Sequence, residues 1–340
     1  MKFKIFLLGF SVTLFILLLI PTQISASEIT DEFPLDNYRV EDGQNEVLNY
    51  LKDNGLDYPV GSKGYVEFLN SISSLKVSAY NQRLMSAYAG IYLMEQENYY
   101  FNDNNHLASN NKENFKLNKS VLRKTIGDFR KENEQKNIEI EKKISEYKLV
   151  NEITGQQVVT AASSNFNRTK AKKYINDNWN KTANSRFGYF GGSGGDCTNY
   201  VSQVIYAGGK KMNYTGKTGV SQFSSNTKGW YSSVYSSSTG NWSTILYSTS
   251  WVRVVDFYAY WSRTSKVYNG LNAKQVAKKV STGDVIQAYN KDNGGWYHTM
   301  VVYDVKNGET RYSGHSKAHK YAHLSYEFKG KGYKFRVIKM

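Results

Sequence analysis

Apolar and polar positions follow a helical period over most of the first half of the chain. Apolar residues at helical spacing occur in residues 45–56, a stretch that ends at an Asn-Gly pair. Residues 66–100 contain enough periodic apolar positions for one or two helices, and residues 120–150 have the pattern of a long, charged amphipathic helix. An Asn-rich loop, residues 101–118, separates them. The pattern predicts a mostly helical region over residues 28–153.

The second half of the chain contains both the helical period and the alternation that is typical of strands. Helices are predicted at 166–180, from Cys197 or Thr198 to 207, and at 272–280, whereas 250–263 fits a helix or a strand. Period-two alternation predicts strands at 283–289, 296–305, 310–316 and 333–340. Residues 213–250 are rich in Ser, Tyr, Gly and Trp and are predicted to be mostly loop. Helices followed by an antiparallel meander indicate an α+β fold.

The N-terminus has the pattern of an export signal. Lys2 and Lys4 precede an apolar run over residues 5–20, and small residues follow it. We predict a signal peptide at residues 1–27, cleaved after Ala26 or Ser27, and a secreted or cell-wall-associated protein. The alternative is an uncleaved membrane anchor, because the run is slightly long for a signal and short for a full span.

Charge divides the remaining chain into two units. Residues 28–160 hold 16 basic and 21 acidic residues, whereas residues 161–340 hold 26 basic and 8 acidic residues, a net charge of +18. Small polar residues at 154–164 have the composition of a linker. We therefore predict a helical region at 28–153 and a second domain at 165–340. The first contains no catalytic constellation and is expected to act as a spacer, a pro-region or a partner-binding module.

Cys197 is the only cysteine of the chain, and it follows a glycine-rich run. A single thiol in an exported protein cannot form an internal disulfide, so it is either a buried apolar side chain or a reactive group. Asp196 is placed to cap a helix that starts at Cys197 or Thr198. The first turn of that helix favours a thiolate. This context favours a nucleophile.

A nucleophilic cysteine needs a base, usually a histidine held by a third polar group. His298 follows a Gly-Gly pair at the start of an alternating strand, on which Trp296, Met300 and Val302 are predicted to share its face. His315 lies on the next predicted strand, so a hairpin would bring it near His298. We predict His298 as the general base and His315 as the residue that orients it.

Other chemistry has weak support in the sequence. His315, His319 and His323 recur every four residues, which on a helix would suggest a zinc site, but no acidic or Cys ligand lies nearby. No phosphate-binding loop or dinucleotide fingerprint occurs, and no nucleic-acid-binding motif accompanies the positive charge. We predict no metal, no cofactor and no nucleic-acid partner.

Several of these segments together resemble a known family. The segments are FNRTKAKKYINDNW, GGDCTNYVSQVIYAGG, SWVRVVDFYAYW, GDVIQAY with WYHTMVV, and YSGHS. They resemble the putative amidase domain family of exported bacterial proteins, a branch of the papain-like NlpC/P60 and CHAP cysteine hydrolases, over about residues 165–325. The resemblance implies a papain-like domain with Cys197 as nucleophile, His298 as base and His315 as third residue. By analogy with related hydrolases, Tyr174 is a candidate oxyanion donor.

One departure from the family pattern concerns the third residue. The family usually has an acidic or amide residue soon after the last histidine, where this chain has Ser316 and Lys317. The resemblance implies hydrolysis of amide bonds through a Cys197 thioester, and export and charge point to peptidoglycan or another anionic wall polymer as partner. Two alternatives remain: a non-catalytic wall-binding or adhesion protein that retains the fold, and a secreted effector acting on other proteins.

Overall fold

The computed structural model describes most of the chain after residue 33. The described residues are 34–102, 115–154, 166–181, 186–188, 190, 196–215, 223–224, 227–236, 243–315, 318–329 and 332–340. The predicted signal peptide lies outside them, as does the predicted linker apart from Thr154. Among the described helices, none combines the length and the apolar character needed to cross a bilayer. Export, signal cleavage and membrane anchoring therefore stay predictions.

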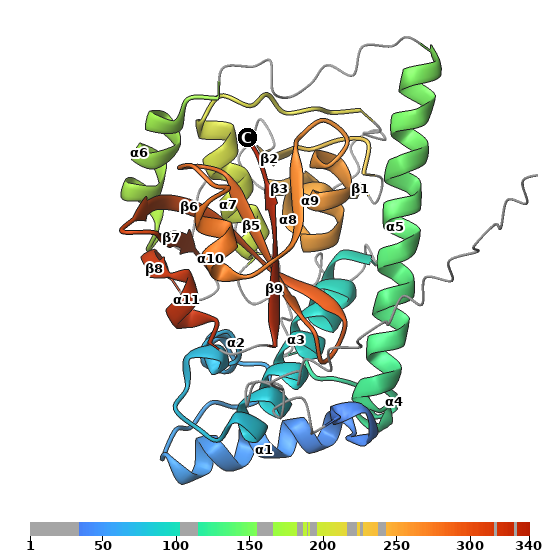
Figure 1. The fold of residues 1–340 in the computed structure, drawn as a ribbon, viewed down its shortest axis with the longest axis vertical. Coiled ribbons are helices and arrows are strands. Elements are labelled where there is room, and N and C mark those ends of the chain that lie inside the picture. The colour runs from blue at the N-terminus through green and yellow to red at the C-terminus, as the bar shows by residue number, and fades with distance from the viewer. Residues whose placement is uncertain are drawn as a thin grey trace, which may run out of the picture. The chain divides into compact units, whose positions relative to one another are not determined.

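Helices dominate the first described part, as the apolar period predicts. They are η2 (Leu35–Asn37), α1 (Val40–Asp53), α2 (Lys63–Leu69), η3 (Ile72–Ser74), α3 (Ala79–Asn102), α4 (Lys119–Arg123) and α5 (Ile126–Thr154). α2 begins where the Ser62 side chain accepts a hydrogen bond from the Tyr65 amide. α1 packs on α3, and α5 is the long helix beside the sheet in Figure 1. Residues 35–340 form one compact unit, and a separate domain at 28–153 stays a prediction.

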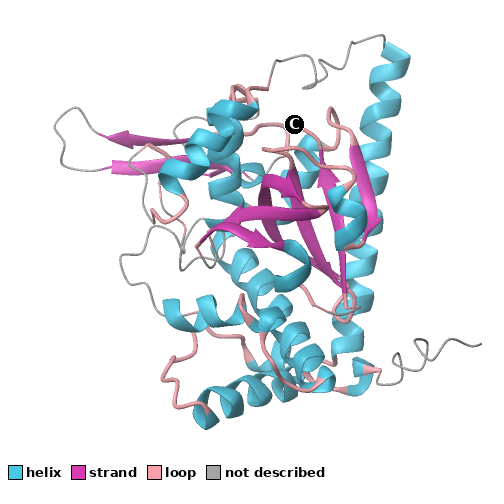
Figure 2. Ribbon diagram, turned by 60° about the vertical axis from the view of Figure 1, so that its left-hand side comes forward, coloured by secondary structure: helices cyan, strands magenta, loops and turns pink. Residues whose placement is uncertain are grey.

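The second part is an α+β arrangement. Its elements are α6 (Arg168–Asn178), α7 (Asp196–Ala207), β1 (Phe223–Ser224), β2 (Ser232–Ser236), β3 (Ser243–Ser248), α8 (Thr249–Val252), α9 (Val254–Trp261), β4 (Val267–Leu271), α10 (Ala273–Ala277), β5 (Val285–Asn290), β6 (Gly295–Lys306), β7 (Glu309–Gly314), β8 (His319–His323), α11 (Leu324–Glu327) and β9 (Tyr333–Ile338). A six-stranded antiparallel sheet has the order β4-β9-β5-β6-β7-β8, and a smaller sheet has the order β1-β3-β2. Figure 2 shows two strands of the smaller sheet extending away from the larger one. The prediction missed β4, β8 and the small sheet within 213–250.

The two faces of the six-stranded sheet belong to different cores. Val285, Val301 and Ile338 join a large core with the apolar residues of α7 and α9. Their strand neighbours Ile286, Met300 and others join a second core with α10 and α11. Successive strand residues point to opposite faces, so each strand contributes to both cores.

A bulge in β6 changes the predicted pattern of faces. Ala288 pairs with His298 and Tyr289 pairs with Trp296, so Tyr297 is an extra residue in β6. The bulge places Trp296 on the face of Arg336, whose guanidinium carbon lies 4.0 Å from the centre of the Trp296 ring. The prediction that Trp296 shares a face with His298 is therefore wrong.

The turn between β5 and β6 inserts between two helices of the first part. The Asn293 side-chain amide donates to the Ala87 carbonyl on α3, at 3.0 Å, and Asn133 on α5 donates to the Asn293 carbonyl at 2.8 Å. Gly90 permits this approach, because a Cβ there would lie 2.3 Å from the Asn293 amide nitrogen. The helices and the sheet are thereby joined by buried polar contacts.

Candidate active site

Cys197 is the second residue of α7, and its side chain is only 2% exposed. The predicted apolar stripe of this helix is buried as expected: Tyr200, Val201, Val204 and Ile205. The polar residues between them are buried as well: Thr198, Asn199, Ser202 and Gln203. α7 is therefore enclosed on all sides, which places the thiol at the start of a central helix.

Buried hydrogen bonds fix the orientation of α7. The Trp251 indole donates to the Asn199 side-chain oxygen at 2.9 Å, and the Trp230 indole donates to Ser202 Oγ at 3.1 Å. Ser202 Oγ in turn donates to the Trp251 carbonyl at 2.9 Å. Because buried polar groups without partners are costly, these bonds hold the helix in one rotation about its axis.

Asp196 joins α7 to His315. One carboxylate oxygen lies 2.9 Å from His315 Nδ1, and the other accepts a bond from the Asn199 amide at 3.1 Å. Asp196 is the first residue of the helix, and both of its oxygens contact side chains. The sequence predicted a backbone cap for this residue, whereas the structure gives it a histidine. His315 also stacks on Tyr200, with ring centroids 3.9 Å apart.

Each ring nitrogen of His315 has its own hydrogen-bond partner. Nε2 lies 3.0 Å from the main-chain oxygen of Asn178, which can only accept, so Nε2 carries a proton. Nδ1 faces the Asp196 carboxylate, which also only accepts when it is ionised. The Asp196 carboxylate and the Asn178 carbonyl together hold the ring in one orientation, beside the residue that precedes Cys197.

His298 lies on the opposite face of the sheet from α7. Its neighbour Thr299 faces the helix and accepts a bond from the Thr198 hydroxyl at 3.0 Å. His298 shares its face with its pairing partner Ala288, a member of the second core. The structure thus brings His315, and not His298, to the start of the Cys197 helix. The catalytic role of His298 stays a prediction.

The surroundings of His298 favour a neutral ring. Its side chain is 8% exposed, and Nδ1 has no hydrogen-bond partner among the described residues. Burial, with a smaller contribution from His319, lowers the pKa of His298 to about 4. His315 cannot orient it as predicted, because both His315 ring nitrogens face Asp196 and Asn178.

Tyr174, the candidate oxyanion donor, contacts α7 further along. Its hydroxyl donates to the Gln203 side chain at 2.7 Å. Gln203 is six residues beyond Cys197, which is about 9 Å along a helix axis. The structure places Tyr174 in the packing of α6 on α7, and an oxyanion role for it stays a prediction.

The repeated histidines do not share a helix face. His315 follows β7, while His319 and His323 stand at the two ends of β8, a separation of about 13 Å for four residues of strand. Among the described residues, no group of three or more His, Cys, Asp or Glu side chains is arranged to hold a metal ion.

Sequence reasoning missed three contributors to this site. Asn178 ends α6 and supplies a carbonyl, a role that no side-chain pattern reveals. Thr299 was overlooked in favour of its neighbour His298. The two side chains point to opposite sides of the strand, and the sequence does not show which one points toward α7. Asp196 had a visible signal, an acid directly before the only cysteine, but that signal was assigned to capping.

Comparison with known families identifies the second part of the chain. The family model described as the putative amidase domain matches residues 165–338, about half of the chain. The chain belongs to this family. Cys197, Asp196 and His315 all lie within the matched putative amidase domain, and the family assignment indicates a hydrolase acting on amides. Comparisons with curated proteins and with solved structures gave no significant match.

Proposed function

We propose that this chain is a cysteine-dependent amide hydrolase of the papain-like class, with Cys197 as nucleophile and His315 as general acid and base. The observation that carries the proposal is the 2.9 Å hydrogen bond between Asp196 and His315, one residue from Cys197. A carboxylate bonded to Nδ1 of an imidazole orients the ring and stabilises its charged form, as in catalytic triads. Asp196 therefore takes the orienting role that the sequence gave to His315.

The chemistry follows in two steps. The Cys197 thiolate attacks the amide carbonyl, and the backbone N–H of Cys197 donates to the developing oxyanion. His315 gives its Nε2 proton to the leaving nitrogen, exchanging the Asn178 carbonyl for that acceptor, and the C–N bond breaks. Water then attacks the thioester while His315 takes its proton, which releases the acid and restores the thiolate.

The substrate we propose is an amide bond of bacterial peptidoglycan. The predicted export signal and the net charge of +18 over residues 161–340 support a polyanionic wall as surroundings. The alternative, a non-catalytic wall-binding or adhesion protein, shares this charge argument and differs in having no turnover.

The deciding experiment is mass spectrometry of peptidoglycan fragments after incubation with the purified chain. We expect wild type to generate new amine and carboxyl ends, and Cys197→Ala or iodoacetamide to abolish them. Release by the Cys197→Ala protein would contradict the cysteine mechanism. If wild type releases nothing while both proteins bind wall material equally, the alternative is correct.

A further inference from the structure

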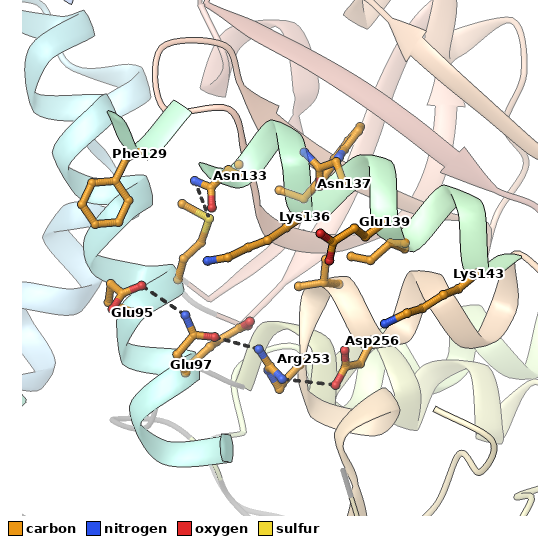
Figure 3. Close-up of a pocket in the computed structure, with 16 residues that line it drawn as sticks. Glu95, Glu97, Phe129, Asn133, Lys136, Asn137, Glu139, Lys143, Arg253 and Asp256 are labelled. Atoms are coloured by element: carbon orange, nitrogen blue, oxygen red, sulfur yellow. Dashed lines mark hydrogen bonds and ion pairs between the residues drawn. The ribbon is translucent and has the colours of Figure 1, made fainter. Parts of the chain in front are cut away.

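A cavity lies between the first helices and the amidase domain, away from Cys197. It encloses about 210 Å³ and is smaller than a drug-sized site. Its walls come from α3, α5, the start of α9 and the start of β6 (Figure 3). Phe129, Ile140 and Trp296 supply apolar surface, while most other lining side chains are polar or charged. None of Asp196, Cys197 and His315 lines it.

Glu97 is the buried acid of this cavity. Its side chain is 5% exposed, and Oε1 is a buried oxygen with no hydrogen-bond partner among the described residues. Oε2 accepts only a long bond from the Val254 amide, at 3.4 Å. An unpartnered buried oxygen on a carboxyl group is costly, and a cationic donor entering the cavity would satisfy it.

The neighbouring charged groups are already engaged. The Arg253 guanidinium donates to Asp256 at 3.3 Å and to the Asn98 side chain at 2.7 Å. The Asn98 amide donates to Glu95 at 3.1 Å. These hydrogen bonds fix one wall of the cavity. Glu97 is the acid on that wall that can still accept a hydrogen bond.

The opposite wall carries two lysines. Lys136 and Lys143 are exposed residues of α5, and Figure 3 shows both extending toward the side chains of α3 and α9. Glu139 stands between them on the same helix. The cavity thus offers an acid in its buried part and ammonium groups along its exposed wall.

We propose that this cavity binds a small amino carboxylate, with its ammonium group on Glu97 and its carboxylate beside Lys143. The complementarity of charge gives the orientation, and the apolar lining accommodates a short methylene chain between the two groups. The site is independent of the proposed hydrolysis, because it shares none of the residues that would carry it.

Proton release provides a signature of the ammonium position. Burial raises the pKa of Glu97 to about 8, with Arg253 opposing the shift, so the carboxyl is mostly protonated at neutral pH. The charged groups around it are Glu95 on α3, Arg253 and Asp256 on α9, and Lys136, Glu139 and Lys143 on α5. An ammonium that binds the ionised form displaces this proton, so affinity rises from pH 6 to pH 8 and then levels.

The test is isothermal titration calorimetry of the purified full chain with glycine, 4-aminobutanoate, 6-aminohexanoate and L-lysine. We expect at least one to bind, with proton release seen as a heat that depends on the buffer below pH 8. Hexylamine and hexanoate, which each lack one charged group, are expected to bind at least about tenfold more weakly than 6-aminohexanoate. No binding of any amino carboxylate at 10 mM would overturn the proposal.

Two variants locate the ligand, and a third separates the sites. Glu97→Gln keeps the shape and should weaken binding about tenfold or more and remove the proton release. Lys143→Gln, on the exposed wall, should weaken amino carboxylates while leaving hexylamine unchanged. Unaltered binding in Glu97→Gln would overturn the proposal. Cys197→Ala should bind like wild type, whether or not the chain hydrolyses amides.

Discussion

Polar residues on the two faces of the six-stranded sheet differ in their hydrogen bonding. On the α7 face, Thr198 donates to Thr299, Gln287 donates to Thr299 at 3.0 Å, and Arg336 donates to Gln287 at 2.7 Å. On the α10 and α11 face, the Nδ1 of His298 has no such partner among the described residues. On the first face, hydrogen bonds position the start of α7. On the second face, burial keeps the imidazole of His298 neutral. A buried histidine is therefore not a base merely because it is a histidine near a glycine turn.

The largest expected effect is a loss of activity, which should be much greater for a variant of His315 than for one of His298. His315→Asn should lower turnover on peptidoglycan by about 10²–10⁴-fold, the usual contribution of a general acid–base group. His298→Asn should cost far less if its fold is retained. Rates measured on the same wall preparation, with melting temperatures of both variants, give the answer. A reversed order would restore His298 as the base.

The next effect is a pH dependence of stability that belongs to the α10 and α11 face. The pKa of His298 is about 4 in the fold, against 6.5 for an exposed histidine. The unfolded chain therefore takes up a proton first as the pH falls, and stability is lost from pH 6.5 down to pH 4, by up to about 3 kcal/mol.

Urea unfolding at pH 7, 5.5 and 4.5 measures this loss. The free-energy difference between His298→Leu and wild type should shift in favour of the variant as the pH falls. The exposed His323 supplies the control, since His323→Leu should show no such shift. Parallel curves for wild type and His298→Leu would refute the neutral, buried ring.

The smallest expected effect is a loss of stability when the hydrogen bonds on the α7 face of the sheet are removed. Thr299→Val preserves shape but leaves the Thr198 hydroxyl and the Gln287 amide without their shared acceptor, and should cost about 1–3 kcal/mol in the free energy of unfolding. Thr310 is the matched control, because its buried hydroxyl has no partner among the described residues. Thr310→Val should be neutral or stabilising. Equal costs for both would show that the bonds contribute nothing.

Local patterns predicted much of this fold. The spacing of Tyr200, Val201, Val204 and Ile205 gave the helix of Cys197 and one of its buried sides, because these depend on neighbours within two turns. Alternation gave β5, β6 and β7 and their antiparallel order. The placement of β9 between β4 and β5 depends on the whole sheet and had no local signal.

The candidate site was predicted in part for the same reason. Cys197 and its helix start are local features, whereas the partner of Asp196 lies 119 residues away. Periodicity says that His298 and Thr299 point to opposite faces, but not which face meets α7. The bulge at Tyr297 then shifts the pattern for Trp296, since one extra residue reverses the faces before it.

The β5–β6 turn that inserts between α3 and α5 has a consequence for synthesis. Asn293 bonds to Ala87 across 206 residues of chain, and Asn133 bonds to Asn293 across 160. The two helices therefore leave the ribosome long before the segment that fills the space between them. Contacts so distant in sequence close slowly, and until then the surface of α3 around Gly90 stays open to water and to other chains. A protein that crosses a membrane before folding would meet this delay on the far side.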